Sequence, residues 1–403
     1  MALRRRNGVH SDGPLGRVKL PSDEKKKRNS FRLRKSHIAK FCVILPLLVA
    51  MVLGTIYLIS VFLGYIPAFL DSPSTFLDWS KSGQPNADLA SHLLDITRDV
   101  KPVPCHSHND YWRRVPLYDA LHRGCTGVEA DVWLVEDDLL VGHSTRALTP
   151  DKTFRSMYVD PLRKMLDHKN EQMDVKRSLV GKSGIFDVAP TQTLVLLVDF
   201  KNNGRDIFPV VSRHLDVLRG RGYLTYFDGV STVQGPITVV ATGNAPFDLI
   251  TANSTYRDIF FDAPLERLYE EPSKPSGFID ADEHDTAKVI ARGGQGTVGT
   301  TPSSHFDSTN SYYASVNFGR SIGWLWFGRI SPKQMKIIRG QIQGAHRRGL
   351  KARYWSAPKW PVSLRNKVWN MFIEEGVDYL NGDDLSGMTS LDWTLRRNSE
   401  LLE

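Results

Sequence analysis

The chain has 403 residues, of which 41% are hydrophobic and 24% charged, as in an ordinary globular protein. Its formal net charge of +8 arises in residues 1–40, which hold 13 Lys/Arg and 3 Asp/Glu, whereas the other residues hold 39 and 41. The body is therefore nearly neutral, which excludes the extended basic face of a nucleic-acid-binding protein. No nucleic-acid partner is expected.

The basic residues 1–40 have little to pack and are predicted to be a disordered tail. No charged residue then occurs from Phe41 to Leu70. A membrane-spanning helix needs about 20 apolar residues, so residues 41–66 are predicted to form a transmembrane signal-anchor helix. A cleaved signal peptide is the alternative, although its apolar region would be shorter.

Orientation follows from the position of the charges, because Lys and Arg beside a span stay in the cytoplasm. The tail is expected to be cytoplasmic, and the rest of the chain to lie in a lumen of the secretory pathway or outside the cell, as a single-pass membrane protein. Residues 67–97 are predicted to connect the span to a domain over residues 98–390, followed by a C-terminal tail, residues 391–403.

The domain alternates apolar strand-like runs with helical patterns. Strands are predicted at residues 102–106, 127–134, 139–143, 193–200, 237–243, 258–264, 350–357 and 377–384. Helices are predicted at residues 116–124, 153–168, 208–222, 331–349 and 363–376.

This alternation predicts a parallel sheet made of βα units, and its length suits a closed (β/α)₈ TIM barrel. A doubly wound open sheet is the alternative, but the first strand is followed by "HSHNDYWRR", which has no glycine-rich turn. Residues 265–312 are polar and rich in Gly, Ser and Thr. They are predicted to be a long mobile insertion over one mouth of the barrel.

In a TIM barrel the functional site lies at the carboxyl ends of the strands. Polar residues gather at several predicted strand ends: His106, His108, Glu129, Asp131, His143, Asp199, Lys201, Arg353, Trp355, Asn381 and Asp383. Three converging carboxylates repel one another, and a hard divalent cation such as Mg²⁺, or Ca²⁺, would relieve that repulsion. Lys201 would suit a phosphoryl oxygen, and the histidines an acid and a base.

Two cysteines fall in the domain, and the strand pattern places Cys105 late in one strand and Cys125 before the next begins. Neighbouring parallel strands would then separate them by about 10 Å, given the rise per residue of a strand. A disulfide needs Cα atoms within about 7 Å. This spacing favours two unpaired cysteines, and the alternative is a disulfide formed in an oxidising lumen.

Four motifs in order, "HSHND", "GVEADVWL", "LLVGH" and "LVDFK", resemble the pattern of the phospholipase-C-like phosphodiesterases. That superfamily includes the glycerophosphodiester phosphodiesterases and the spider-venom-type sphingomyelinases D, which share a (β/α)₈ barrel. The layout with an N-terminal anchor is most similar to the fungal "altered inheritance of mitochondria protein 6" family. The His-Arg-Gly and Pro-Glu-Asn-Thr motifs of the glycerophosphodiester enzymes are absent.

The resemblance implies roles by position. Glu129, Asp131 and Asp199 would bind the metal, and His143 would be one catalytic histidine. The other would be His106, as its place directly after the strand suggests, or His108, whose spacing to Glu129 is nearer that of the sphingomyelinase D type.

Three further residues are candidates for binding substrate. Lys201 would contact the phosphoryl group, and Arg353 would bind phosphate or pair with a carboxylate in the barrel. Trp355, with Trp324 and Trp326, would line an apolar or choline-like pocket by cation–π contact. Packing in the core is expected for at least two of these three tryptophans.

The predicted function is that of a membrane-anchored, metal-dependent phosphodiesterase acting on a lipid-derived phosphodiester. One histidine would deprotonate a hydroxyl and the other would protonate the leaving alcohol, with a cyclic or a hydrolysed product. The competing function is a non-catalytic lumenal barrel that serves as a binding module. The sequence leaves the head group, the membrane compartment and the oligomeric state open.

Overall fold

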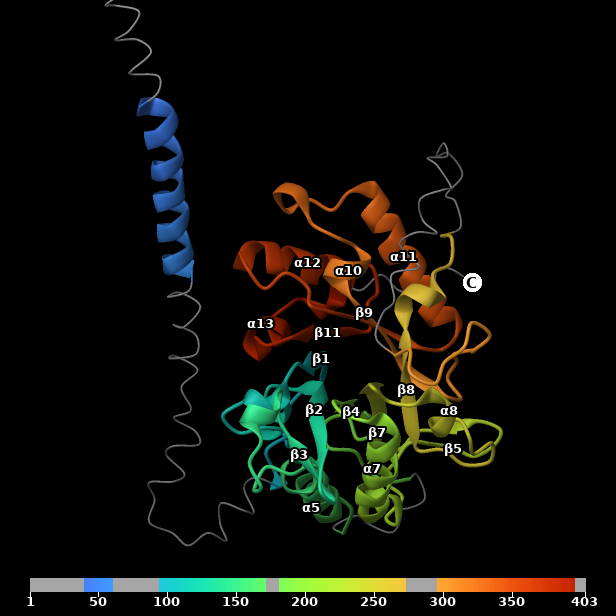
Figure 1. Cartoon of the computed structure of the whole chain (residues 1–403). Coiled ribbons are helices and arrows are strands. Elements are labelled where there is room, and N and C mark those ends of the chain that lie inside the picture. Colours follow the sequence, from blue (N-terminus) through green and yellow to red (C-terminus); the bar gives the residue numbers. More distant parts are fainter. Residues whose placement is uncertain (1–39, 61–93, 172–180, 273–295, 396–403) are drawn as a thin grey trace, which may run out of the picture. The chain divides into compact units, whose positions relative to one another are not determined.

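The structure, a computed structural model, describes residues 40–60, 94–171, 181–272 and 296–395 (Figure 1). The chain divides into two compact units, residues 1–75 and residues 76–403. Most of the predicted basic tail and connector, and part of the C-terminal tail, lie outside the described residues.

In the first unit the described residues form one helix, Lys40–Ser60. It has 21 residues and a mean hydropathy of 2.6, and none of its apolar window is buried against protein. By length and composition it can cross a membrane. The last residues of the predicted span, 61–66, lie outside the described residues.

The second unit is a closed barrel of eight parallel strands, which confirms the predicted TIM barrel. Going round it, the order is β1, β11, β10, β9, β8, β7, β4 and β2, and β1 pairs with β2 to close the ring. The strands are β1 (Val103–Ser107), β2 (Cys125–Val135), β4 (Leu194–Phe200), β7 (Ile237–Gly243), β8 (Ile259–Pro264), β9 (Ser311–Asn317), β10 (Lys351–Trp355) and β11 (Tyr379–Gly382).

Helices lie outside the barrel (Figure 1). They are α4 (Tyr118–His122), α5 (Asp160–Glu171), α7 (Gly204–Arg219), α8 (Phe247–Ile250), α10 (Phe318–Ser321), α11 (Pro332–Arg347), α12 (Val362–Glu374) and α13 (Leu385–Thr389). The predicted start of α11 is confirmed, because Ser331 caps it and forms a reciprocal capping box with Gln334.

The strand predicted at residues 139–143 is present but does not belong to the barrel, and one barrel strand was not predicted. β3 (Asp138–Val141) is antiparallel to the end of β2 and forms a hairpin beyond the barrel, so it is not a barrel strand. The barrel is completed instead by β9, whose first two residues fall in the predicted insertion 265–312 and whose other residues were predicted to form no element. Its serines and asparagine hid the strand, yet five of its seven residues are buried.

The segment predicted as a mobile insertion begins with ordered structure. Leu265–Leu268 forms a 3₁₀ helix in which Leu265, Glu266 and Leu268 are buried. Residues 273–295 lie outside the described residues, and the part after them leads into β9.

The main hydrophobic core lies between the strands and the surrounding helices, and a second cluster of Val195, Leu197, Val240, Tyr313 and Tyr379 fills the barrel interior. Parallel strands covered on both faces explain the nearly continuous apolar runs in the sequence. Several polar side chains are nevertheless buried on these strands, among them Glu129, Asp131 and Arg353.

Cys105 and Cys125 form a disulfide, so the expectation that they stay unpaired was wrong. β2 begins at Cys125 itself, which pairs with Val103. An irregularity in β1 then shifts the register, so that His106 faces Gly127. Between these two pairs β1 advances three residues while β2 advances two, so β1 contains one extra residue. This brings the Cα atoms of the two cysteines to 4.7 Å, a distance that regular strand spacing did not predict.

Candidate functional site

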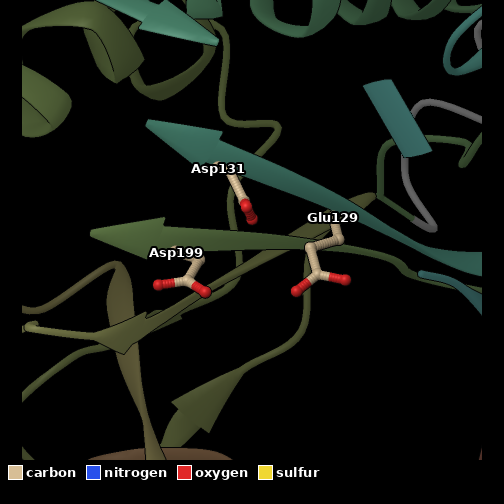
Figure 2. A group of neighbouring side chains, drawn as sticks. All are labelled: Glu129, Asp131 and Asp199. Atoms are coloured by element: carbon tan, nitrogen blue, oxygen red, sulfur yellow. The ribbon is translucent and has the colours of Figure 1, made fainter. Parts of the chain in front are cut away.

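The structure brings three carboxylates together on neighbouring strands. Glu129 and Asp131 lie on β2 and Asp199 lies on β4, where Asp131 and Asp199 are partners in the strand register. One oxygen from each carboxylate lies within 4.8 Å of the others. Figure 2 shows the three side chains pointing into one shared space. Alternation along β2 explains why Glu129 and Asp131 face the same way.

This acidic trio is electrostatically costly. Burial, with repulsion from Glu129 and Asp199, raises the pKa of Asp131 to about 7. Burial also raises the pKa of Asp199, against the attraction of Lys201. Lys201 follows β4, and its Nζ lies 2.8 Å from Asp131 Oδ2 and 2.6 Å from Asp199 Oδ2. One ammonium group therefore pairs with two of the three carboxylates, and the cluster keeps an excess of negative charge.

The trio can hold a metal ion. Its donors are carboxylate oxygens, which hard divalent cations prefer. Asp131 Oδ1 is buried and has no hydrogen-bond partner among the described residues, although buried carboxylate oxygens are normally satisfied. A backbone N–H fixes Glu129, since Asn109 N donates to its Oε2 at 3.0 Å. Gly243 leaves room for Asp199, because a Cβ there would meet Asp199 Oδ1 at 1.9 Å.

The two histidines of the HSHND motif, His106 and His108, lie in different surroundings. His106 lies in β1 and is fully buried, with Nδ1 3.3 Å from the Tyr313 hydroxyl. Gly127 is required beside it, because a Cβ at Gly127 would come within 2.5 Å of His106 Nδ1. Burial, reinforced by the positive charge of Arg353 and by His108, holds the pKa of His106 well below its usual range. These surroundings therefore disfavour protonation of His106.

His108 follows β1 and is partly exposed, with 22% of its side-chain surface accessible. Its Nδ1 lies 2.7 Å from Asp383 Oδ1, just after β11. This contact leaves Nε2 as the atom for another partner. A carboxylate on one ring nitrogen fixes the tautomer and the orientation of an imidazole.

His143 follows β3, and its Nδ1 lies 3.2 Å from the Tyr111 hydroxyl and 3.4 Å from Asp131 Oδ2. The β2–β3 hairpin places it there, since Trp133 Nε1 donates to the Gly142 carbonyl at 2.7 Å. The indole ring of Trp112 lies against the imidazole, with centroids 4.9 Å apart. His143 therefore adjoins the acidic trio.

Three partners were missed by the sequence reasoning. Tyr111 lies within hydrogen-bond distance of Asp131 and His143, and burial and the neighbouring carboxylates keep its pKa high. Asn109 supplies the N–H to Glu129, and Asp383 orients His108. Asn109 and Tyr111 follow directly on the histidine motif, and Asp383 was seen only as a strand-end residue. Their spacing gave no sign of their partners.

The loop that carries these residues is fixed by a buried carboxylate. Asp110 accepts hydrogen bonds from Ser107 Oγ at 2.7 Å, Leu117 N at 2.6 Å and the Tyr158 hydroxyl at 3.1 Å. Burial raises its pKa to about 6, and these donors oppose that rise. The loop after β1 is thereby held in one conformation beside the trio.

Arg353 lies inside the barrel on β10 and is only 1% exposed. Its Nε donates to Ser315 Oγ at 3.0 Å and its Nη1 to Asn381 Oδ1 at 2.7 Å, and its Nη2 lies 3.7 Å from Asp262 Oδ2. Arg353 therefore pairs with a carboxylate of the barrel, Asp262, which was one of its two predicted roles. Its contact with phosphate stays a prediction.

The predicted packing of tryptophans in the core was wrong for two of the three. Trp324 is 78% exposed and Trp326 is 73% exposed, whereas Trp355, at the end of β10, is half-buried. Trp355 thus stays a candidate for contacting substrate. The two exposed indoles lie on the segment that joins α10 to α11, and Trp326 begins a short 3₁₀ helix there, Trp326–Gly328.

Comparison with known proteins gives a consistent relationship. The family model described as "AIM6-like phosphodiesterase domain" matches residues 94–262. The "Altered inheritance of mitochondria protein 6 homolog" of Arthroderma benhamiae is 36% identical over 299 residues, covering 72% of this chain and 84% of the relative. "Altered inheritance of mitochondria protein 6" of Saccharomyces cerevisiae is 32% identical over 318 residues, covering 75% and 74%.

Two solved structures are also similar. A glycerophosphoryl diester phosphodiesterase from Parabacteroides distasonis has a TM-score of 0.36 at 12% identity, covering 77% of this chain and 93% of that one. The phosphatidylinositol-specific phospholipase C of Listeria monocytogenes has a TM-score of 0.34 at 10% identity, covering 73% and 94%.

Proposed function

Since this chain belongs to the altered inheritance of mitochondria protein 6 family, as its motifs predicted, we propose that it is a metal-dependent phosphodiesterase. The observation that carries the proposal is the trio of Glu129, Asp131 and Asp199, with one oxygen from each within 4.8 Å of the others. His143 Nδ1 lies 3.4 Å from Asp131 Oδ2, and His108 follows β1, the strand that pairs with β2. A cation site with imidazoles on flanking segments suits phosphodiester cleavage.

The cation we propose is Mg²⁺. The trio offers only carboxylate oxygens, and Mg²⁺ is typically held by a few carboxylates together with substrate phosphate oxygens. Ca²⁺ accepts the same donors but takes more of them. Bound here, the ion would supply Lewis-acid stabilisation of charge on the phosphoryl oxygens.

The residues of the chain would move the protons. One imidazole takes the proton from a hydroxyl, whose oxygen bonds to phosphorus while the bond to the leaving oxygen breaks. The other imidazole donates a proton to that leaving alcohol. Attack by a hydroxyl of the substrate itself would give a cyclic phosphate, and attack by water would give an opened product. Lys201 would neutralise charge beside the phosphoryl group.

We assign the two proton-transfer roles to His108 and His143. His108 is partly exposed and is oriented by Asp383 at 2.7 Å, and His143 adjoins Asp131 through Tyr111. His106 supports the interior instead, because it is fully buried against Tyr313 and Gly127. A buried neutral imidazole beside Arg353 is poorly placed to accept a proton.

We propose a lipid-derived substrate and a lumenal or extracellular barrel. Helix Lys40–Ser60 would anchor the chain in a bilayer, with the basic residues on the cytoplasmic side. The disulfide Cys105–Cys125 suits an oxidising compartment. Asn253 opens an Asn-Ser-Thr sequon and is exposed, so it would be available for glycosylation there.

The test is a screen of the detergent-solubilised full chain against glycerophospho-, inositol- and sphingo-phosphodiesters, with Mg²⁺, with Ca²⁺ and with chelator. We expect cleavage of at least one class, loss of activity on chelation, and no activity in Asp131→Asn. Metal binding without turnover of any class would favour the alternative, a non-catalytic binding module.

A further inference from the structure

The segment Gly323–Arg329, between α10 and α11, carries three large aromatic side chains in solvent. Trp324 is 78% exposed, Trp326 is 73% exposed and Phe327 is 97% exposed. We call this segment the aromatic loop; it belongs to the orange part of the chain in Figure 1. Scattered exposed apolar residues are normal, but three within four positions indicate an interaction site.

The backbone of the aromatic loop is held from behind. Leu325 is buried, and Gln334 Nε2 donates to the carbonyls of Ile322 and Trp324 at 3.0 and 3.1 Å. Lys367 Nζ, on α12, donates to the Gly328 carbonyl at 3.1 Å. The aromatic side chains are therefore displayed outward by a supported backbone, which reduces the entropy lost on binding a partner.

The aromatic loop lies on the same rim as the acidic trio. It follows β9 through α10, and the strands of the barrel are parallel, so it belongs with the carboxyl ends of the strands. Two more exposed tryptophans follow strands at this rim: Trp112 after β1, at 59%, and Trp360 after β10, at 42%. Among the described residues, every exposed tryptophan lies on this rim.

The sequence on either side of the aromatic loop carries basic residues and no acidic ones. From Ser308 to Ile373 the sequence contains 12 Lys/Arg and no Asp or Glu. Arg329, the last residue of the aromatic loop, and Arg320 and Lys333, which flank it, are all exposed. Basic side chains beside an apolar surface complement the anionic head groups of a lipid bilayer.

We propose that the aromatic loop docks the barrel rim on an anionic lipid bilayer. The two indoles lie at the level of the head groups, where tryptophan is enriched, and Phe327 enters the acyl region. Arg320, Arg329 and Lys333 contact anionic head groups. The site would then face the membrane, so a lipid could reach it without crossing bulk water. This docking requires the exposed aromatic and basic side chains and is independent of any catalysis.

The test uses the full chain in nanodiscs that contain doxyl-labelled lipid as a quencher. A fluorophore is attached at Phe327→Cys or, as the matched control, at Val230→Cys, each in a Cys42→Ala background. Val230 is 87% exposed in the turn between β5 (Tyr226–Phe227) and β6 (Thr232–Val233), which precedes β7 and so belongs to the opposite rim. Both positions share one barrel and one anchor.

We expect lipid quenching at position 327 to exceed that at position 230 several-fold in anionic discs, and to fall in neutral discs and at high salt. Adding Arg320→Gln and Arg329→Gln to the Phe327→Cys variant should also reduce it. Equal quenching at the two positions, or quenching at 327 that ignores lipid charge, would overturn the proposal.

Discussion

Two groups of buried charge lie in the same barrel and are balanced in opposite ways. On β8 and β10, Asp262 faces Arg353, whose guanidinium is also bonded to Ser315 and Asn381. On β2 and β4, three carboxylates lie together, and Lys201 pairs with two of them, Asp131 and Asp199. The first group has one anion for one fixed cation, whereas the second has an excess of negative charge.

The difference separates structure from function. A buried charge is expensive unless it is paired, so a barrel that only needed to fold would balance each acid as Asp262 is balanced. The trio keeps more negative charge than Lys201 can offset. Such a cluster is costly to the free protein and is explained by a cation that binds to it.

The largest effect should come from the trio itself. Asp131→Asn or Asp199→Asn should lower kcat/KM on a phosphodiester by about 10⁴-fold, or roughly 5 kcal/mol, because the metal contribution is lost. Asp262→Asn is the matched control, since it removes the same charge from a balanced pair and should keep most of the activity. Equal losses of kcat/KM in all three variants would show that the trio and the Asp262–Arg353 pair do not differ in function.

The balanced pair should instead govern stability. Arg353→Met leaves Asp262 as an uncompensated buried carboxylate and should lower the free energy of unfolding by about 4 kcal/mol. Urea unfolding of the detergent-solubilised chain, followed by near-ultraviolet circular dichroism, measures this. The double variant with Asp262→Leu should recover part of the loss; no recovery would show that Arg353 acts through other contacts.

The next largest effects should distinguish the two histidines of the HSHND motif, His106 and His108. His108→Gln should lower kcat by about 100-fold, or roughly 3 kcal/mol, with little change in stability, because a proton-transfer group is removed. His106→Gln should mainly lower stability, since His106 is fully buried beside Tyr313 and Gly127. If the two variants exchanged these phenotypes, our assignment would be reversed.

The smallest effect concerns Asp383. Burial raises the pKa of this carboxyl, but hydrogen bonds from His108 and Lys359 outweigh burial and hold it below its usual range. Asp383 therefore adds stability above its unfolded pKa of about 4, and this is lost as the pH falls through the lower folded value. Asp383→Asn should make the free energy of unfolding depend less on pH in this acidic range. It should also lower kcat by about tenfold, because His108 loses the carboxylate that orients it.

Much of the fold could be predicted from local sequence. β4 and β7 are apolar runs, and Ser331 with Pro332 marks the start of α11. β9 was missed because its serines face a polar interior that includes Arg353, which no local pattern reveals. The acidic trio could be predicted because parallel strands bring their carboxyl ends together.

Contacts between distant residues could not be predicted in this way. The disulfide depends on one extra residue in β1, and Tyr111 and Asp383 act through partners set by the closed barrel. The exposure of Trp324 and Trp326 could not be predicted either. A tryptophan-rich segment has the same composition whether its side chains pack in the core or lie in solvent.

The central claim is that the acidic trio binds a divalent cation, and direct titration tests it. Isothermal calorimetry of the full chain with Mg²⁺ should show one saturable site that Asp131→Asn and Asp199→Asn abolish and Asp262→Asn preserves. Absence of binding to the wild-type chain, or equal binding to the trio variants, would contradict the account.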